Sequence, residues 1–194
     1  MIDNLLELDK ILFIFLNGLG SPSFDIFWLI ITNKILNAII YLLLAFYFFK
    51  KTNFKYFSLM ILTISVLILF TDQFTNFIKH TVSRPRPCHE ADLESVIRLV
   101  KENCGGAYGY FSAHASNSFA LAFFFSRLFS KQKWLTIILI SFAFIVSYSR
   151  IYIGVHYPLD VFSGIILGSF SGYIIYSFWK KFIFDFQSHK INNL

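Results

Sequence analysis

The sequence predicts an all-α, polytopic membrane protein: a helix bundle with about five transmembrane helices, preceded by an amphipathic helix at the membrane interface. The first observation behind this prediction is composition, since 56% of the 194 residues are hydrophobic and only 14% are charged, whereas soluble domains carry about 25% charged residues. The second is that five apolar runs approach the roughly 20 residues that a helix needs to cross a bilayer. Two cysteines are too few for a disulfide scaffold, and the composition excludes disordered and collagen-like chains.

The first expected element is a helix over residues 1–17. Leu5, Leu8 and Phe15 follow a helical period, with charged residues between them, a pattern typical of a helix that lies on the membrane surface. The segment lacks the basic start, continuous apolar block and small-residue cleavage site of a signal peptide. The turn signal at Gly18–Pro22 is expected to end this helix.

The membrane-spanning helices are expected next, within a single domain over residues 1–194. The first two expected spans contain Lys34 and Asp72, which do not suit lipid contact. These two side chains could pair beneath a polar site, either to support it or as a plain buried ion pair. The five expected spans are Phe24–Phe49, Tyr56–Ile78, Ser112–Phe129, Trp134–Tyr148 and Pro158–Trp179.

Basic residues in the connections predict the orientation. Residues 50–55, 127–133 and the C-terminal tail hold nine Lys and Arg on one side, which the positive-inside rule assigns to the cytoplasm. The long loop over residues 83–109 then lies outside, in a multi-pass protein of the bacterial inner membrane. The positive net charge is explained by orientation, so no nucleic-acid partner is expected. The outer side also carries six basic residues, which need a separate explanation.

Three polar motifs fall on that outer side, and they form the core of the domain between residues 72 and 160. Each has a plain alternative reading: a charge cluster facing lipid head groups, a helix cap, or a turn that joins two helices. Their occurrence at one membrane face favours a common site. The motifs are Lys79–Pro87, Phe111–His114 and Ser149–Asp160.

The cations of these motifs indicate an anion site. Lys79, Arg86 and Arg150 bring three positive charges to the same side without an obvious acidic partner. A guanidinium fork matches phosphate oxygens, and a lysine adds a point charge. Helices are expected to begin near Ser112 and Pro158, and helix N-termini also favour a bound anion.

The histidines supply reactive groups. His156 and Asp160 are four residues apart at a helix start, so they share a face and the carboxylate can fix the imidazole tautomer. Such a histidine is a candidate nucleophile, and His114 is then the candidate acid for the leaving oxygen. Because the cations already neutralise a phosphoryl group, we expect no metal and no other cofactor.

The pattern Lys-x6-Arg-Pro, Ser-x-His and Ser-Arg-x5-His-x3-Asp resembles the type-2 phosphatidic acid phosphatase superfamily, over roughly residues 56–179. The resemblance implies an α-helical membrane fold and metal-independent hydrolysis of a phosphoester through a phosphohistidine. It implies that Lys79, Arg86, Ser112 and Arg150 bind the phosphate, His156 is the nucleophile, His114 is the acid and Asp160 orients His156.

The second motif departs from the family's usual Pro-Ser-Gly-His, because Phe111 and Ala113 replace Pro and Gly. Alanine keeps the N–H donor and loses ready access to positive φ. The small size resembles bacterial members that act on envelope lipids, which implies lipid A phosphate, undecaprenyl diphosphate or phosphatidylglycerol phosphate as substrate, a lipid bilayer as environment and no obligate protein partner. The alternatives are a non-catalytic binder or transporter of anionic lipid, and a phosphatase of a soluble phosphorylated metabolite.

The two cysteines, Cys88 and Cys104, enclose 15 residues of the outer loop. An oxidising compartment permits a disulfide between them, and we predict one. Two free thiols are the alternative.

Overall fold

The computed structural model describes residues 2–101 and 103–184, and every regular element among them is helical. The all-α prediction is confirmed. Two single-turn 3-10 helices, Pro87–His89 and Ala91–Leu93, lie in the long connection between α4 and α5. The α-helices are α1 Ile2–Gly18, α2 Pro22–Ile31, α3 Lys34–Lys51, α4 Phe54–Val82, α5 Ala113–Leu128, α6 Lys133–Tyr152 and α7 Pro158–Phe184.

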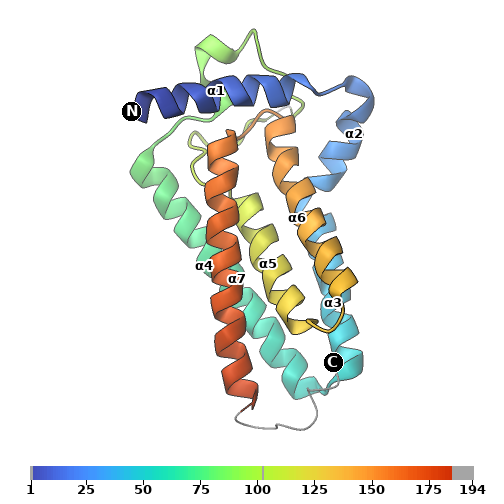
Figure 1. The fold of residues 1–194 in the computed structure, drawn as a ribbon. Helices are drawn as coiled ribbons and strands as arrows, with labels where there is room; N and C mark the ends of the chain where they lie inside the picture. The colour runs from blue at the N-terminus through green and yellow to red at the C-terminus, as the bar shows by residue number, and fades with distance from the viewer. Residues whose placement is uncertain (1, 102, 185–194) are drawn as a thin grey trace.

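Helices α3 to α7 form a bundle, and α1 lies across its upper end (Figure 1). Helix α5 is central, because it packs against α4, α6 and α7, and most of its side chains are buried. The connection from α4 to α5 lies at the same end as α1. The polar motifs therefore gather beneath a cover built from the first helix and the longest loop.

Three of the described helices, α4, α6 and α7, are long and apolar enough to span a membrane. A fourth span results if α1 and α2, which meet at a bend of 111°, count as one broken span. This number is lower than the five expected spans. Helix α5 has only 16 residues, and α3 carries lysines at both of its ends. Both helices nevertheless take their places in the bundle through contacts with longer neighbours.

The expected continuous helix over Phe24–Phe49 is wrong, because the chain breaks between α2 and α3. Asn33 caps α3: its side-chain oxygen accepts hydrogen bonds from the backbone N–H groups of Ile35 and Leu36, at 2.8 and 3.3 Å. A capping asparagine offers these N–H groups the partners that another helical turn would otherwise supply. The break places Lys34 at the start of a new helix.

Three glycines of α7 allow α5 and α7 to pack at close range. Gly164, Gly168 and Gly172 recur every four residues on one face, and a Cβ at Gly168 or Gly172 would collide with backbone carbonyl groups of α5. Small residues at this spacing let two helix backbones approach closely within a membrane. The contact also brings the two helix starts together, since the Ser112 N–H donates to the Asp160 carbonyl oxygen at 2.9 Å.

Helix α1 is confirmed over the predicted segment, and it has two distinct faces. Asp9, Phe13 and Asn17 are buried against the bundle, whereas Leu8 and Phe15 are 63% and 62% exposed. The inward face anchors the helix, because Asn17 donates from its amide to carbonyl groups at the end of α6. The outward apolar face suits contact with lipid, as the amphipathic pattern predicts.

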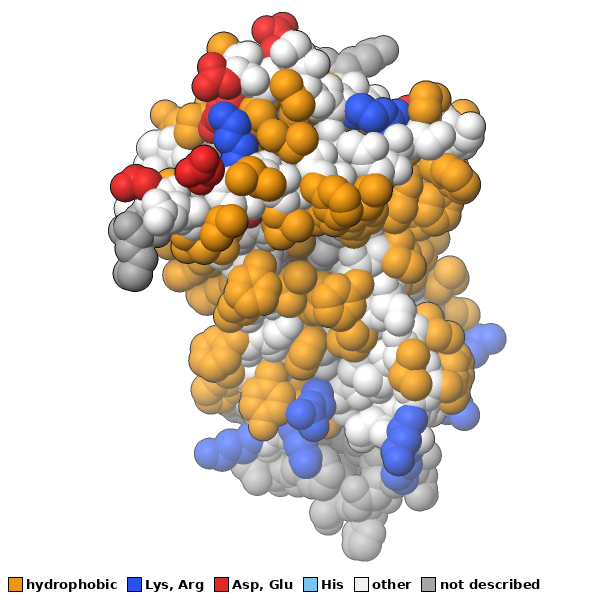
Figure 2. Space-filling model, turned by 45° about the horizontal axis from the view of Figure 1, so that its top comes forward, with side chains coloured by type: hydrophobic (Ala, Val, Ile, Leu, Met, Phe, Trp, Pro, Cys, Tyr) orange, Lys and Arg blue, Asp and Glu red, His pale blue; other side chains and the backbone are white. Residues whose placement is uncertain are grey.

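The surface divides into zones that fit an integral membrane protein. Hydrophobic side chains cover the middle of the molecule. Lys and Arg predominate at its lower end, whereas the upper end carries Asp and Glu together with a few Lys and Arg (Figure 2). The described basic residues at the lower end belong to the α3–α4 and α5–α6 connections and to the end of α7.

Candidate active site

The seven candidate residues come from four helix ends at the upper part of the bundle and from the loop that joins α4 to α5. The structure brings together the end of α4, the start of α5, the end of α6 and the start of α7. The residues concerned are Lys79, Arg86, Ser112, His114, Arg150, His156 and Asp160.

His156 and Asp160 form the buried centre of this region. The Nδ1 atom of His156 lies 3.4 Å from Oδ2 of Asp160, and neither side chain is more than 3% exposed. The same oxygen accepts the backbone N–H of Tyr157 at 3.0 Å. Since Nδ1 faces the carboxylate, the Nε2 atom is the nitrogen left for chemistry.

The surroundings keep the His156 imidazole neutral. Burial lowers its pKa well below 6.5, and the positive charges of Arg150, Arg86 and Lys79 lower this pKa further. All three predicted phosphate-binding cations therefore act on this one imidazole. A neutral imidazole with a free nitrogen lone pair is the nucleophilic form of histidine.

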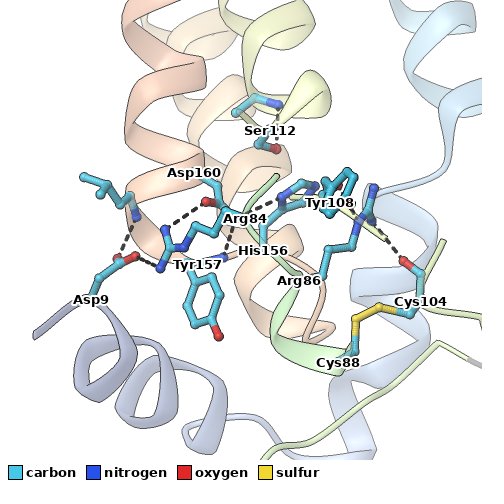
Figure 3. Close-up of polar contacts among 12 residues, drawn as sticks. Asp9, Arg84, Arg86, Cys88, Cys104, Tyr108, Ser112, His156, Tyr157 and Asp160 are labelled. Carbon is cyan, nitrogen blue, oxygen red and sulfur yellow. Dashed lines mark hydrogen bonds and ion pairs between the residues drawn. A yellow bond between two sulfur atoms is a disulfide. The ribbon is translucent and has the colours of Figure 1, made fainter. Parts of the chain in front are cut away.

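Arg86 is held by the backbone of the α4–α5 loop. Its Nε atom donates to the Tyr108 carbonyl oxygen at 3.1 Å, and an Nη atom donates to the Cys104 carbonyl oxygen at 2.9 Å (Figure 3). Cys104 is joined to Cys88 in a disulfide with a Cα–Cα distance of 6.1 Å, so the predicted bond is confirmed. The crosslink fixes the loop segment that aims the Arg86 guanidinium.

Arg150 and Lys79 keep donors available. One Nη atom of Arg150 donates to the Thr32 hydroxyl at 2.5 Å, while the buried Nε atom has no partner among the described residues. Lys79, near the end of α4, forms no ion pair with any residue that the structure describes. Unpaired donors and charges of this kind are suited to an anionic ligand.

The start of α5 supplies Ser112 and His114. Ser112 is buried at the N-cap, and its hydroxyl oxygen accepts the Ala115 N–H at 3.5 Å. Since the Ser112 N–H is already bonded to α7, the hydroxyl hydrogen is the donor that a phosphate could receive. His114 follows in the first helical turn and lies partly exposed on the wall of a cavity.

Arg84 and Asp9 belong to the same network, although the sequence did not single them out. Arg84 donates to Asp160 Oδ1 at 3.1 Å and to Asp9 Oδ2 at 2.6 Å, and so bridges the two carboxylates (Figure 3). Its guanidinium also lies 4.0 Å from the centre of the Tyr157 ring. Asp9 reaches α7 as well, because its Oδ1 atom accepts the Leu159 N–H at 2.8 Å. Helix α1 is thereby tied to the carboxylate that faces His156.

Gly109 is a further position that the sequence analysis missed. A Cβ there would lie 2.9 Å from Asp160 Oδ2 and 3.6 Å from His156 Nδ1. The loop backbone thus closes over the histidine–aspartate pair at a distance that only glycine permits. A glycine in a polar loop is too common a feature to have indicated this contact.

The pairing of Asp72 with Lys34 that the sequence suggested does not occur. Asp72 Oδ1 accepts a hydrogen bond from the Asn117 amide at 2.8 Å, and no ion pair joins Asp72 to Lys34 in the described part of the chain. Both side chains line the cavity that also contains His114. Within the described ranges, no cluster of three or more His, Cys, Asp or Glu side chains is placed to share a metal ion.

Comparisons with known proteins show what the chain as a whole is similar to. The model of the PAP2 superfamily matches residues 54–184. A lipid A 4'-phosphatase of Bacteroides thetaiotaomicron is 36% identical over 97% of this chain and 84% of its own length, and a protein of the same name from Porphyromonas gingivalis is 35% identical over 89% and 73%. The crystal structure of a PAP2-type phosphatidylglycerolphosphate phosphatase from Bacillus subtilis has a similar fold, with a TM-score of 0.69, 20% identity, and coverage of 96% of this chain and 89% of that one.

Proposed function

Because the chain belongs to the PAP2 superfamily and is a membrane lipid phosphatase, we propose that it hydrolyses a phosphate monoester of lipid A through a phosphohistidine on His156. The catalytic part of this proposal rests on one observation: Nδ1 of the buried His156 imidazole faces a carboxylate oxygen of Asp160 at 3.4 Å, which leaves Nε2 for the attack on phosphorus. The substrate part rests on the two lipid A 4'-phosphatases that match most of the chain.

The site favours binding of a phosphate in front of His156. Lys79, Arg86 and Arg150 neutralise the phosphoryl oxygens, and the Ser112 hydroxyl supplies a further donor. Preorganised cations in a site with little water stabilise the charge that develops as the phosphorus is attacked. This arrangement needs no metal ion, so activity is expected to persist in a chelator.

The first chemical step forms a bond between Nε2 of His156 and phosphorus. The bond between phosphorus and the lipid oxygen breaks, and its electron pair stays on that oxygen. This oxygen takes a proton from His114, whose protonated form the bound phosphate dianion favours. Asp160 accepts the hydrogen bond of Nδ1–H and stabilises the positive charge that grows on the His156 ring. The products are the dephosphorylated lipid and a phosphohistidine.

The second step returns the enzyme to its starting state. A water molecule loses a proton to His114, now neutral, and its oxygen attacks phosphorus. The bond from phosphorus to Nε2 breaks, and the electron pair returns to the imidazole. Inorganic phosphate leaves, and both histidines recover their original protonation.

We place the active site at the outer, periplasmic face of the bacterial inner membrane. The Lys and Arg side chains at the opposite end of the bundle favour a cytoplasmic position for that end by the positive-inside rule. The Cys88–Cys104 disulfide beside the site supports the same orientation, because disulfides persist in oxidising compartments.

A phosphate-release panel tests the proposal. Purified protein with chelator is assayed on lipid A, undecaprenyl diphosphate, phosphatidylglycerol phosphate and a water-soluble sugar phosphate. We expect the highest kcat/KM on lipid A and no release by folded His156→Ala. Release by His156→Ala at the parental rate would refute the mechanism. A preference for the soluble phosphate, or lipid binding without any turnover by the parental protein, would favour the alternatives from the sequence analysis.

A further inference from the structure

A cavity of about 440 Å³ lies between α3, α4 and α5, next to the residues described above. This volume is in the range of small-molecule sites in proteins, about 300–1,000 Å³. Its walls include one face of α3, between Lys34 and Ala45, and one face of α4, between Ile61 and Asp72. Eleven residues of helix rise by about 16 Å, so the cavity extends from the site well into the apolar part of the bundle.

The chemistry of the lining changes along this length. Near the site the walls carry Lys34, Asp72 and His114, whereas farther along α3 and α4 they carry Leu42 and Ile64. A pocket that is polar beside the reacting centre and apolar farther into the bundle matches an amphiphile. Its orientation matches a lipid whose phosphate is at the site and whose hydrocarbon extends toward the membrane interior.

The position of His114 identifies which part of the substrate enters. In the proposed mechanism His114 protonates the oxygen that leaves phosphorus, so that oxygen must lie beside it. Because His114 is part of the cavity wall, the group attached to the leaving oxygen continues into this cavity. The cavity is therefore on the leaving-group side of the phosphorus, opposite the attacking nitrogen of His156.

The polar end of the cavity is ordered by a chain of hydrogen bonds. The Thr71 hydroxyl donates to Asn117 Oδ1 at 2.6 Å, and the Asn117 amide donates to Asp72 Oδ1 at 2.8 Å. The carboxylate of Asp72, which lines the cavity, has acceptor capacity beyond this one bond. A second cavity-lining oxygen, Asn37 Oδ1, is buried without a partner among the described residues.

Acceptors inside a cavity need donors from a bound molecule or from water, because a buried acceptor left without a hydrogen bond is costly. Hydroxyl and amide N–H groups on a ligand would satisfy them. A polyprenyl phosphate has no such donors. The ester groups of a glycerolipid are acceptors only, so a glycerolipid offers at most a headgroup hydroxyl, as in phosphatidylglycerol phosphate. An acylated amino sugar carries both kinds of donor next to its phosphate.

We propose that this cavity binds the leaving group of the substrate as an acylated sugar unit, with hydroxyl or amide donors on Asp72 and Asn37 and hydrocarbon against the apolar walls of α3 and α4. Lys34 adds a positive charge at the mouth. The inference rests on the proposed function and specifies how the site recognises a glycolipid phosphate.

Cavity variants of purified protein, assayed on two lipids, test the inference. The lipids are lipid A and phosphatidic acid, and the measured quantity is the ratio of their kcat/KM values. Asn117→Leu removes the donor that orients Asp72, and we expect the ratio to fall about tenfold or more, as expected when a buried polar partner is lost. Gln73→Leu, on an exposed position of α4 outside the cavity, is the matched control and should keep the parental ratio.

The apolar part is tested on lipid A alone. Ile64→Trp fills the cavity and should raise KM about tenfold, whereas Leu62→Trp, on a side chain that is 60% exposed, should not. If Ile64→Trp fails to give a single peak in gel filtration, Ala38→Leu on the opposite wall replaces it, with the same expectation.

The outcomes separate the two proposals. Parental protein that hydrolyses phosphatidic acid and not lipid A would refute the proposed substrate, and this inference with it. The inference alone is refuted if the parental protein prefers lipid A and the cavity variants lose kcat/KM equally on both lipids, or on neither.

Discussion

Replacing Arg84 by Met tests how the protein positions its nucleophile. Arg84 is 13% exposed and bridges Asp160, which is fully buried, and Asp9, which is 5% exposed. The substitution leaves both carboxylates without their cation, and removing one partner of a buried ion pair lowers stability by about 3–5 kcal/mol. We therefore expect a clear fall in the Tm of the purified protein.

The catalytic effect follows from the lost hydrogen bond to Asp160. A hydrogen bond to a charged group contributes about 1.5–3 kcal/mol, and 1.4 kcal/mol in the activation barrier corresponds to a factor of ten. Since Asp160 faces His156, we expect kcat to fall roughly ten- to 150-fold. KM should change little, because both Nη atoms of Arg84 are bonded to carboxylates and not directed at a phosphate.

Initial rates of phosphate release from lipid A give kcat and KM for Arg84→Met, Arg84→Lys and a control. Lysine keeps the charge and should restore part of kcat. The control is Arg98→Met, which removes another arginine–carboxylate contact, to Asp25 at 3.0 Å, that does not involve Asp160. It should lower Tm and keep kcat. Parental kcat in folded Arg84→Met, or an equal loss of kcat in Arg98→Met, would refute the reasoning.

Three further predictions concern titration, the disulfide and helix packing. Because burial and the surrounding cations lower the pKa of His156, the imidazole becomes protonated and inactive only at low pH. After correction for titration of the substrate phosphate, the loss of kcat/KM that protonation of His156 causes should therefore occur below pH 6.5. A loss of this kind that begins above pH 6.5 would contradict the prediction. Replacing Cys88 and Cys104 by Ser opens the crosslinked loop and should lower stability by about 3 kcal/mol. It should also raise KM, since the Cys104 carbonyl accepts a hydrogen bond from Arg86, which we propose to bind the phosphate. An unchanged Tm and KM would count against this prediction. Gly168→Ala should lower Tm through its collision with α5, whereas Gly106→Ala, which meets nothing within 4 Å, should not; equal Tm values would show that α5 and α7 do not depend on this contact.

The helices were largely predictable, because apolar runs of the required length leave few alternatives in a bilayer. The break before α3 was not, although Asn33 followed by Lys34 inside an apolar run signals a cap. The four-residue repeat of glycines in α7 is also visible in the sequence, but its meaning depends on which helix lies opposite. Pattern alone does not specify that partner.

The candidate site, like the fold, was predictable from the sequence only in part. Lys79, Arg86 and His156 could be singled out from the sequence. The two cations follow one apolar run, and the histidine lies four residues before a carboxylate at the start of another run, on the same predicted side of the membrane. Asp9 lies 75 residues from Arg84 in the chain, and no local pattern relates the two. Contacts of this kind arise only from the tertiary packing of α1 on the bundle.

The most direct test of the account is to trap the covalent intermediate. The protein is mixed with lipid A that carries radiolabelled phosphate, the reaction is stopped in alkali within one turnover, and the labelled peptide is sequenced by mass spectrometry. We expect phosphate on a ring nitrogen of His156, and no protein-bound label in folded His156→Ala. Label on another side chain, or turnover by the parental protein with no covalent label at any time, would contradict it.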